Sequence, residues 1–124
     1  MRWGYGPTPN STRWAAEHRA WQAVVVSTRE QVEQAAARLA GVVGDSPLQR
    51  SERLSARVGG EVWLKREDLQ AVRSYKGRGA YNLIAQLDAE QRAAGVVCAS
   101  AGNHGQGVAF ACRALDVRGR VYVP

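Results

Sequence analysis

Apolar side chains recur every three or four residues in several segments after residue 26, and this spacing predicts amphipathic helices. The first predicted helix begins at Ser27, which forms a capping box with Glu30, and it ends at Gly41 and Gly44. Its apolar positions are Val32, Ala35, Ala36, Leu39, Ala40 and Val43. Further helices are predicted over 54–58, 75–88, 88–94 and 103–115.

Short extended runs separate these helices and predict strands at 48–50, 61–65, 96–100 and 119–123. The run at 96–100 contains the adjacent valines Val96 and Val97, which indicates a strand buried on both faces of a parallel sheet. Helices that alternate with short strands predict an α/β fold, in which flanking helices cover a parallel sheet.

The first 26 residues differ from the rest because they show no sustained hydrophobic period. They contain three of the four tryptophans, Trp3, Trp14 and Trp21, together with several glycines and prolines. We interpret 1–26 as an irregular N-terminal extension and 27–124 as the folded part of the chain.

Composition argues against several classes of function. The net charge is +6, but the arginines are scattered and form no nucleic-acid-binding module, so no nucleic-acid partner is expected. The apolar stretches are too short to span a bilayer or to form a secretory signal. Cys98 and Cys112 lack further Cys or His pairing, which favours free buried thiols over a disulfide or a zinc site. We therefore expect a cytoplasmic protein with neither a metal site nor a membrane partner.

Lys76 is one of only two lysines in a chain with fifteen arginines, and it lies in the segment SYKGRGA at 74–80. A lysine kept against that bias suggests a need for a primary amine, because an amine can form a Schiff base and a guanidinium cannot. At the first turn of its helix, the positive end of the helix dipole favours the neutral, nucleophilic amine. A surface cation is the alternative. For the other lysine, Lys65, we expect a solvated ion pair.

The segment SAGNHGQG at 100–107 joins the predicted strand at 96–100 to the helix at 103–115. Such a turn offers free backbone N–H groups and the positive end of a helix dipole, which suits a carboxylate or a phosphate. Asn103 is expected to cap the helix, and its side chain can also donate a hydrogen bond to a ligand oxygen. In the alternative interpretation Asn103 only caps, while Gly105 and Gly107 allow close packing of helix and sheet.

Together these two segments resemble the fold-type II pyridoxal-phosphate enzymes, and most closely the threonine dehydratase (threonine ammonia-lyase) family of isoleucine biosynthesis. The resemblance starts at DSPLQ (45–49), continues through VWLKREDLQ (62–70) and both segments above, and reaches GRVYVP (119–124). All of these motifs occur in the family's order, which makes the combination specific. The resemblance implies that 27–124 is the N-terminal portion of a tryptophan synthase β-like catalytic domain.

The family resemblance also implies roles for individual residues. Lys76 would bind pyridoxal phosphate as a Schiff base and remove the α-proton of the substrate. Asn103 would hydrogen-bond the 3′-oxygen of the cofactor, and Tyr75 would pack near its ring, with a core aromatic as the alternative for Tyr75. Arg78 is expected to be an exposed helix cation outside the site. The substrate carboxylate is expected at Ser100, Ala101, Gly102, Asn103 and His104. The implied reaction deaminates L-threonine to 2-oxobutanoate and ammonia, in an enzyme that forms homo-oligomers.

Ala101 bears on the type of reaction. In the related serine racemases the equivalent residue is a serine that acts as acid or base on the opposite face of the cofactor. A methyl group cannot transfer a proton, so Ala101 favours elimination over racemisation. Gly105 is shared with racemase-like relatives, and Gly77 replaces a bulkier residue, which costs up to about 1 kcal/mol of helix stability. A serine/threonine dehydratase–racemase relative is therefore an alternative.

The chain is short for the resembled fold, which needs two α/β domains. Two expected features are not found in the sequence: the glycine-rich loop that holds the cofactor phosphate, and the serine or threonine that faces the pyridine nitrogen. We therefore expect a truncated fold that acts as part of a longer enzyme and has no dehydratase activity alone. The alternative is a non-catalytic fragment or gene remnant, including a small protein that associates with a full-length homologue.

Overall fold

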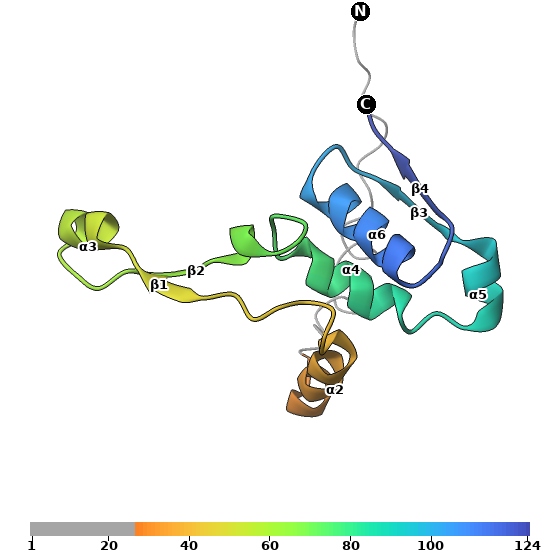
Figure 1. Ribbon diagram of the computed structural model, residues 1–124, viewed down its shortest axis with the longest axis horizontal. Helices are drawn as coiled ribbons and strands as arrows, with labels where there is room; N and C mark the ends of the chain where they lie inside the picture. The colour runs from red at the N-terminus through yellow and green to blue at the C-terminus, as the bar shows by residue number, and fades with distance from the viewer. Residues whose placement is uncertain (1–26) are drawn as a thin grey trace, which may run out of the picture. The chain divides into compact units, whose positions relative to one another are not determined.

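The computed structural model describes residues 27–124 and divides the chain into two units, Met1–Val32 and Glu33–Pro124. The extension expected at 1–26 lies outside the described residues. In chain order the elements are α2 (Arg29–Leu39), β1 (Leu48–Arg50), α3 (Glu52–Val58), β2 (Trp63–Lys65), the 3-10 helix η1 (Glu67–Leu69), α4 (Lys76–Ile84), α5 (Ala89–Ala94), β3 (Val96–Ala99), α6 (Asn103–Ala114) and β4 (Gly119–Tyr122) (Figure 1).

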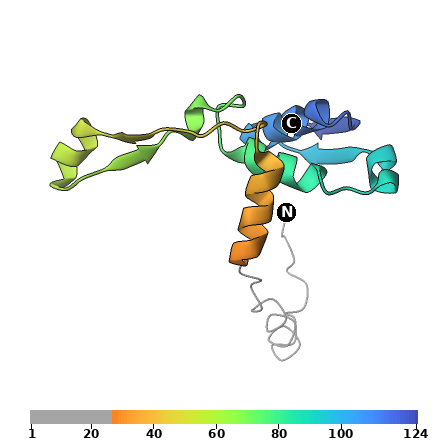
Figure 2. The same cartoon turned by 60° about the horizontal axis from the view of Figure 1, so that its bottom comes forward.

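Strands β3 and β4 pair in parallel, with Val96 opposite Gly119 and Ala99 opposite Tyr122. Helix α6 connects these strands and packs against both of them and against α4 (Figures 1 and 2). This arrangement confirms the predicted α/β class with a parallel sheet and flanking helices. The pair β1–β2 is antiparallel, which departs from the expected single parallel sheet, because α3 and its flanking turns reverse the chain between the two strands.

The apolar core lies between α4, α6 and the β3–β4 pair. Its buried members are Ala80, Ile84, Val108, Ala111, Cys112 and Val117. Small residues on α6 let the two helices approach closely, and Gly107 lies at the point of contact. A Cβ atom on Gly107 would lie 2.9 Å from both the carbonyl carbon and the carbonyl oxygen of Lys76. Main chain meets main chain here, so only glycine fits at 107 without a shift of one helix.

The first described helix, α2, begins one residue later than predicted. The backbone N–H of Thr28 donates to Oε1 of Gln31 at 2.9 Å, and the N–H of Gln31 donates to Oγ1 of Thr28 at 3.2 Å. The predicted capping box of Ser27 with Glu30 is therefore wrong. The sequence carries the same pattern in two overlapping registers, and the Thr28 register is the one that forms.

Helix α4 ends at Ile84, so the predicted helix over 75–88 is too long. Asp88 caps α5 instead: its side chain accepts the N–H of Gln91 at 2.8 Å, and Gln91 accepts the N–H of Asp88 at 3.1 Å. This second capping box fixes the start of α5, because its two hydrogen bonds satisfy N–H groups that have no partner within the helix.

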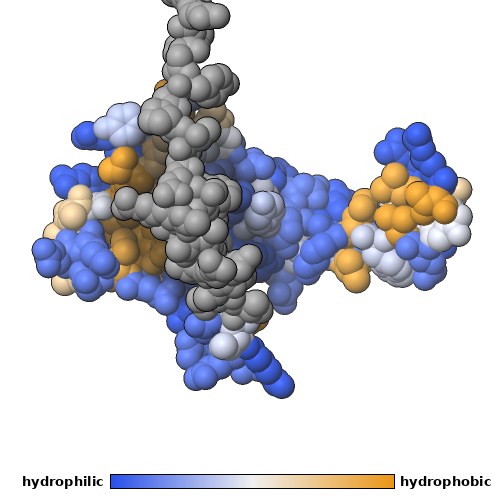
Figure 3. Space-filling view, turned by 180° about the vertical axis from the view of Figure 1, so that it is seen from behind, coloured by the Kyte–Doolittle hydropathy of each residue, from blue (hydrophilic) through white to orange (hydrophobic). Residues whose placement is uncertain are grey.

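Strand β3 is not buried on both faces, which corrects the prediction for 96–100. Val96 and Cys98 are partly buried, whereas Val97 is 67% exposed. Other large apolar side chains of the described chain are exposed as well, among them Leu48, Val58, Trp63, Leu83, Tyr122 and Val123. Figure 3 shows apolar side chains gathered in two separate areas of the face that it presents.

We expect Gly107→Ala to lower the free energy of unfolding of the full chain by about 1–3 kcal/mol, since the added methyl group overpacks the contact between α4 and α6. Urea denaturation followed by circular dichroism measures the change. Gly79→Ala is the matched control, because no atom beyond the nearby backbone of its own helix lies within 4 Å of its added Cβ and alanine raises helix propensity. Equal stability of Gly107→Ala and the wild type would contradict the packing argument.

Candidate functional site

Lys76 is the first residue of α4, as its segment predicts. The hydroxyl of the buried residue Ser74 accepts the backbone N–H of Lys76 at 3.4 Å. The amine of Lys76 lies 4.8 Å from the centre of the Tyr75 ring. Tyr75 itself is 58% exposed, so the alternative of a core aromatic is wrong for the described residues.

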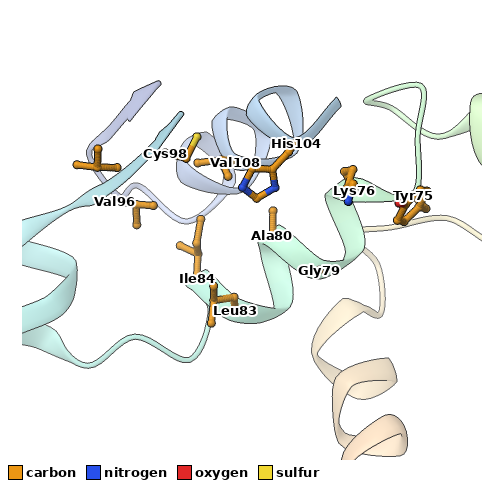
Figure 4. Close-up of a pocket in the computed structure, with 11 residues that line it drawn as sticks. Tyr75, Lys76, Gly79, Ala80, Leu83, Ile84, Val96, Cys98, His104 and Val108 are labelled. Atoms are coloured by element: carbon orange, nitrogen blue, oxygen red, sulfur yellow. The ribbon is translucent and has the colours of Figure 1, made fainter. Parts of the chain in front are cut away.

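A pocket of about 320 Å³ opens beside Lys76, between α4, β3 and α6. Its walls are mainly apolar, and they are formed by Ala80, Leu83, Ile84, Val96, Val97 and Val108, with Gly79 and Cys98. Polar side chains enter it from Lys76 and Tyr75 at one end and from His104 on α6. In Figure 4 the imidazole of His104 projects from α6 toward Ala80 on α4. The pocket thus brings together two segments that are far apart in the sequence.

Two hydrogen bonds of the Gly102 backbone hold the turn between β3 and α6. The N–H of Gly102 donates to the hydroxyl of Ser100 at 3.3 Å, and the carbonyl of Gly102 accepts the N–H of Gln106 at 3.2 Å. Gly102 is therefore the capping residue, and the prediction that Asn103 caps the helix is wrong, since Asn103 is already the first helical residue. The exposed side chain of Asn103 forms no hydrogen bond with residues 27–124 and is available to a ligand.

The predicted site residues divide into two groups. Lys76, Tyr75 and His104 line the pocket. Ser100, Ala101, Gly102 and Asn103 lie on the turn that leads directly to His104, outside the pocket lining. The first N–H groups of α6 have no acceptor within the helix, so this turn offers donors to an anion.

Gly105 lies in the first turn of α6 and faces the strands. A Cβ atom at this position would lie 2.9 Å from the carbonyl oxygen of Ser100 and 3.1 Å from Val121. An alanine at 105 would therefore push the turn away from β4 in this structure. The choice of glycine here sets how tightly the Ser100 turn packs.

The sequence did not predict an ion pair between Arg78 on α4 and Glu67, neither of which lines the pocket. Arg78 donates from Nε to Oε2 of Glu67 at 2.9 Å and from Nη2 to Oε1 at 3.0 Å. The prediction that Arg78 is an exposed cation is wrong, because both partners are partly buried. The guanidinium lowers the pKa of the Glu67 carboxyl, and Glu67 raises the pKa of Arg78. The only sequence signal for this pair was the presence of two acidic residues, Glu67 and Asp68, in the KREDL segment at 65–69.

Side-chain hydrogen bonds also fix the loop before β1. Lys65 donates from Nζ to the carbonyl oxygen of Ser46 at 2.6 Å, so it holds the backbone rather than forming the predicted solvated ion pair. The amide of Gln70 donates to the carbonyl oxygen of Gly44 at 2.6 Å. The hydroxyl of Ser46 donates to Glu67, which joins this loop to the Glu67–Arg78 pair.

Both described cysteines are free, as predicted. Cys112 is buried, and burial raises the pKa of its thiol. Cys98 is only partly buried and lines the pocket, which corrects the prediction of two buried thiols. Within residues 27–124 no three His, Cys, Asp or Glu side chains gather where they could hold a metal ion, and no helix is long and apolar enough to cross a membrane.

An apolar pocket lined by Lys76 and by His104, which directly follows a strand-to-helix turn, defines a candidate cofactor site. Residues 39–124 match the family model described as pyridoxal-phosphate dependent enzyme. The chain belongs to this family, which confirms the resemblance and the cofactor that it implies.

Relatives of this chain include the protein "L-threonine dehydratase biosynthetic IlvA" of Mycobacterium leprae (strain TN), which is 68% identical over 93 residues. The match covers 75% of this chain and 22% of the relative. The protein of the same name from Bacillus subtilis (strain 168) is 58% identical over 83 residues, which cover 67% of this chain and 20% of the relative. The chain thus spans about a fifth of the length of these curated relatives.

Solved structures with the same fold include maize serine racemase, with a TM-score of 0.74 and 35% identity over 79% of this chain and 31% of that chain. The processed form of threonine deaminase isoform 2 from Solanum lycopersicum has a TM-score of 0.64 and 39% identity, over 79% of this chain and 28% of that chain. These similarities confirm the predicted partial fold-type II architecture.

The pocket described above fits the cofactor of the family. It supplies a partly buried primary amine, mainly apolar walls and a helix N-terminus nearby. Its volume of about 320 Å³ lies in the range of small-molecule sites. Lys76 is the one lysine that lines this pocket among residues 27–124, and His104 of the first turn of α6 lines it too.

The Glu67–Arg78 pair gives a pH-dependent stability. Since the pKa of Glu67 lies below its ordinary value of 4.5 when folded, its ionised form stabilises the fold above pH 4.5, and that stability is lost as the pH falls through the lowered pKa. We expect the melting temperature of the wild type to fall more steeply below pH 4.5 than that of Glu67→Gln. Arg78→Gln should flatten the profile in the same way. Parallel profiles for all three proteins would contradict this assignment.

Proposed function

We propose that this chain provides the lysine-bearing part of a pyridoxal-phosphate-dependent threonine ammonia-lyase, which converts L-threonine to 2-oxobutanoate and ammonia. The observation that carries the proposal is the single apolar pocket shared by Lys76 and His104. The 68% identity to a protein named threonine dehydratase supports the choice of substrate. We further propose that the longer enzyme is a cytoplasmic homo-oligomer that acts on a small amino acid and binds no nucleic acid.

Lys76 has two roles in this proposal. Its amine would hold the cofactor, and its Nζ would accept the α-proton of the substrate. The bound cofactor supplies a conjugated ring that stores the electron pair left behind. The apolar side chains of Ala80, Ile84 and Val108 line the pocket beside Lys76, and the lower polarity that they give it would strengthen charge interactions made there.

The α6 turn orients the ligands in this proposal. Asn103 would donate its side-chain amide to the 3′-oxygen of the cofactor. The backbone N–H groups of Ala101, Asn103 and His104 would receive the substrate carboxylate, with Ser100 and His104 at its edges. Tyr75 would pack near the ring of the cofactor. Ala101 has no proton to transfer, which supports elimination over racemisation.

Two observations favour other functions. The TM-score of 0.74 to maize serine racemase, together with Gly105, supports a serine/threonine dehydratase–racemase relative. The exposed apolar residues Leu83 and Val97 at the pocket support a non-catalytic fragment that associates with a full-length homologue. Turnover measurements separate these candidates from the proposed one.

Borohydride trapping tests the cofactor role of Lys76 directly. After incubation with pyridoxal phosphate and reduction, mass spectrometry should find the label on Lys76, because a partly buried amine in an apolar pocket is favoured over an exposed one. Lys76→Arg should remove this label although it keeps the charge. Lys65→Arg is the matched control and should keep it. Labelling of Lys65 in preference to Lys76 would refute the role of Lys76.

Turnover should require the rest of the fold. We expect the chain alone to produce no 2-oxobutanoate from L-threonine with excess pyridoxal phosphate, since it lacks the glycine-rich phosphate loop that the family resemblance implies. A chimera that joins 39–124 to the remaining residues of the Mycobacterium leprae relative should be active. Lys76→Arg in the chimera should lower turnover by at least about 1,000-fold, as the loss of a covalent catalyst does. Activity of that variant, or of the chain alone, would contradict the proposal.

A further inference from the structure

The loop that presents Lys76 is closed by an ion pair at its base. Residues 70–75 connect η1 to α4, and Arg73 within this loop has a φ of 55°, a left-handed conformation that costs energy for a residue other than glycine. The N–H of Arg73 donates to the carbonyl of Gln70 at 2.8 Å, which tightens the turn. Glu67 precedes this loop and Arg78 follows it, so their contact joins its two ends.

The contact between Glu67 and Arg78 fixes orientation as well as distance. Two nitrogens of the guanidinium bind two oxygens of the carboxylate, and such a planar fork holds both groups in one plane. The Nη2 atom of Arg78 also donates to the carbonyl of Gly44 at 3.2 Å, and Ser46 donates to Glu67. The first turn of α4 is thereby tied to two other segments of the chain.

We propose that Glu67 and Arg78 are positioning residues that set the direction of the Lys76 amine. Arg78 lies two residues after Lys76, and side chains at this spacing leave a helix on different faces. Arg78 thus anchors the side of α4 away from the pocket while Lys76 faces it. On another side, Gly107 lies against the main chain of Lys76. Without the ion pair, the strained loop around Arg73 relaxes and the amine loses its fixed direction.

This inference rests on the proposed function, because a direction matters only if Lys76 reacts in the pocket. A neighbouring ion pair supplies the comparison. Arg66 binds Asp68 through two contacts of 2.8 and 2.7 Å, a geometry much like that of Glu67 with Arg78. Arg66 and Asp68 are two residues apart, so this second pair closes no loop and does not reach α4. Asp68 also interacts through its charge with Arg73, so this pair is a control for the loss of an ion pair beside the loop without a contact to α4.

The test measures the ratio of labelled to unlabelled Lys76 after pyridoxal phosphate and borohydride treatment of the full chain, because Lys65 is linked to Glu67 through Ser46 and cannot serve as an internal reference. Glu67→Gln and Arg78→Gln should each lower this ratio about tenfold, the order of effect expected when a reacting group is misplaced by less than 1 Å. The double variant should lower it no further, because both changes break one contact. Arg78→Lys should not restore the ratio, since an ammonium cannot bridge both oxygens.

Asp68→Asn should keep the wild-type ratio. An unchanged ratio in Glu67→Gln and Arg78→Gln, or an equal loss in Asp68→Asn, would overturn the proposal. Amide hydrogen exchange without cofactor separates positioning from unfolding: faster exchange should be confined to 70–80, and an equal rise in α6 would overturn the proposal.

The same exchange measurement distinguishes this inference from the proposed function. If the wild type labels Lys65 as readily as Lys76, the cofactor role of Lys76 fails. Faster exchange over 70–80 in Glu67→Gln and Arg78→Gln, but not in Asp68→Asn, would then still support the pair as the device that holds this turn. Equal labelling of the two lysines in the wild type together with unchanged exchange over 70–80 in these variants would overturn both the cofactor role of Lys76 and the role of the ion pair.

Discussion

The contact between Gly107 and the main chain of Lys76 determines the geometry of the rest of the site. Because backbone lies against backbone, side-chain volume cannot adjust the separation of α4 and α6 there. The small core residues Ala80 on α4 and Ala111 on α6 belong to the same apolar core, and the pocket opens beside Lys76. The position of the reactive amine thus follows from main-chain packing, which is more rigid than a contact between long side chains.

Around this fixed point, apolar and charged groups lie on different sides of α4. The pocket side carries Ala80 and Ile84, while the other side carries Arg78 bound to Glu67. Because Arg78 and Glu67 lie on the other side of the helix, Lys76 is the only lysine or arginine that lines the pocket among residues 27–124. This separation suits chemistry in which one amine must exchange protons without a competing counter-ion.

Sequence patterns predicted most of the elements, because periodicity and capping residues are local. They failed where two local solutions compete, as with the overlapping capping boxes of Ser27 and Thr28, or where a glycine backbone can cap in place of Asn103. The motifs at 74–80 and 100–107 were enough to select Lys76 and His104 as candidate site residues. The Glu67–Arg78 pair could not be predicted, because charge pairing across a folded loop produces no periodic pattern in the sequence. The exposure of Val97 was missed because burial on both faces depends on what packs against the strand.

The parallel pairing of β3 with β4 has a consequence for how the protein folds while it is being translated. Strand β3, which forms one wall of the pocket, has β4 as its only partner strand among residues 27–124. Gly119, where β4 begins, follows Lys76 by 43 residues, so at about 5–20 residues per second the lysine leaves the ribosome roughly 2–9 s before that partner. During this interval β3 has no partner strand from residues 27–124, so the pocket wall that it forms is not yet held by β4. In the proposed enzyme, binding of the cofactor at Lys76 would therefore follow the docking of β4 and not the synthesis of the lysine itself.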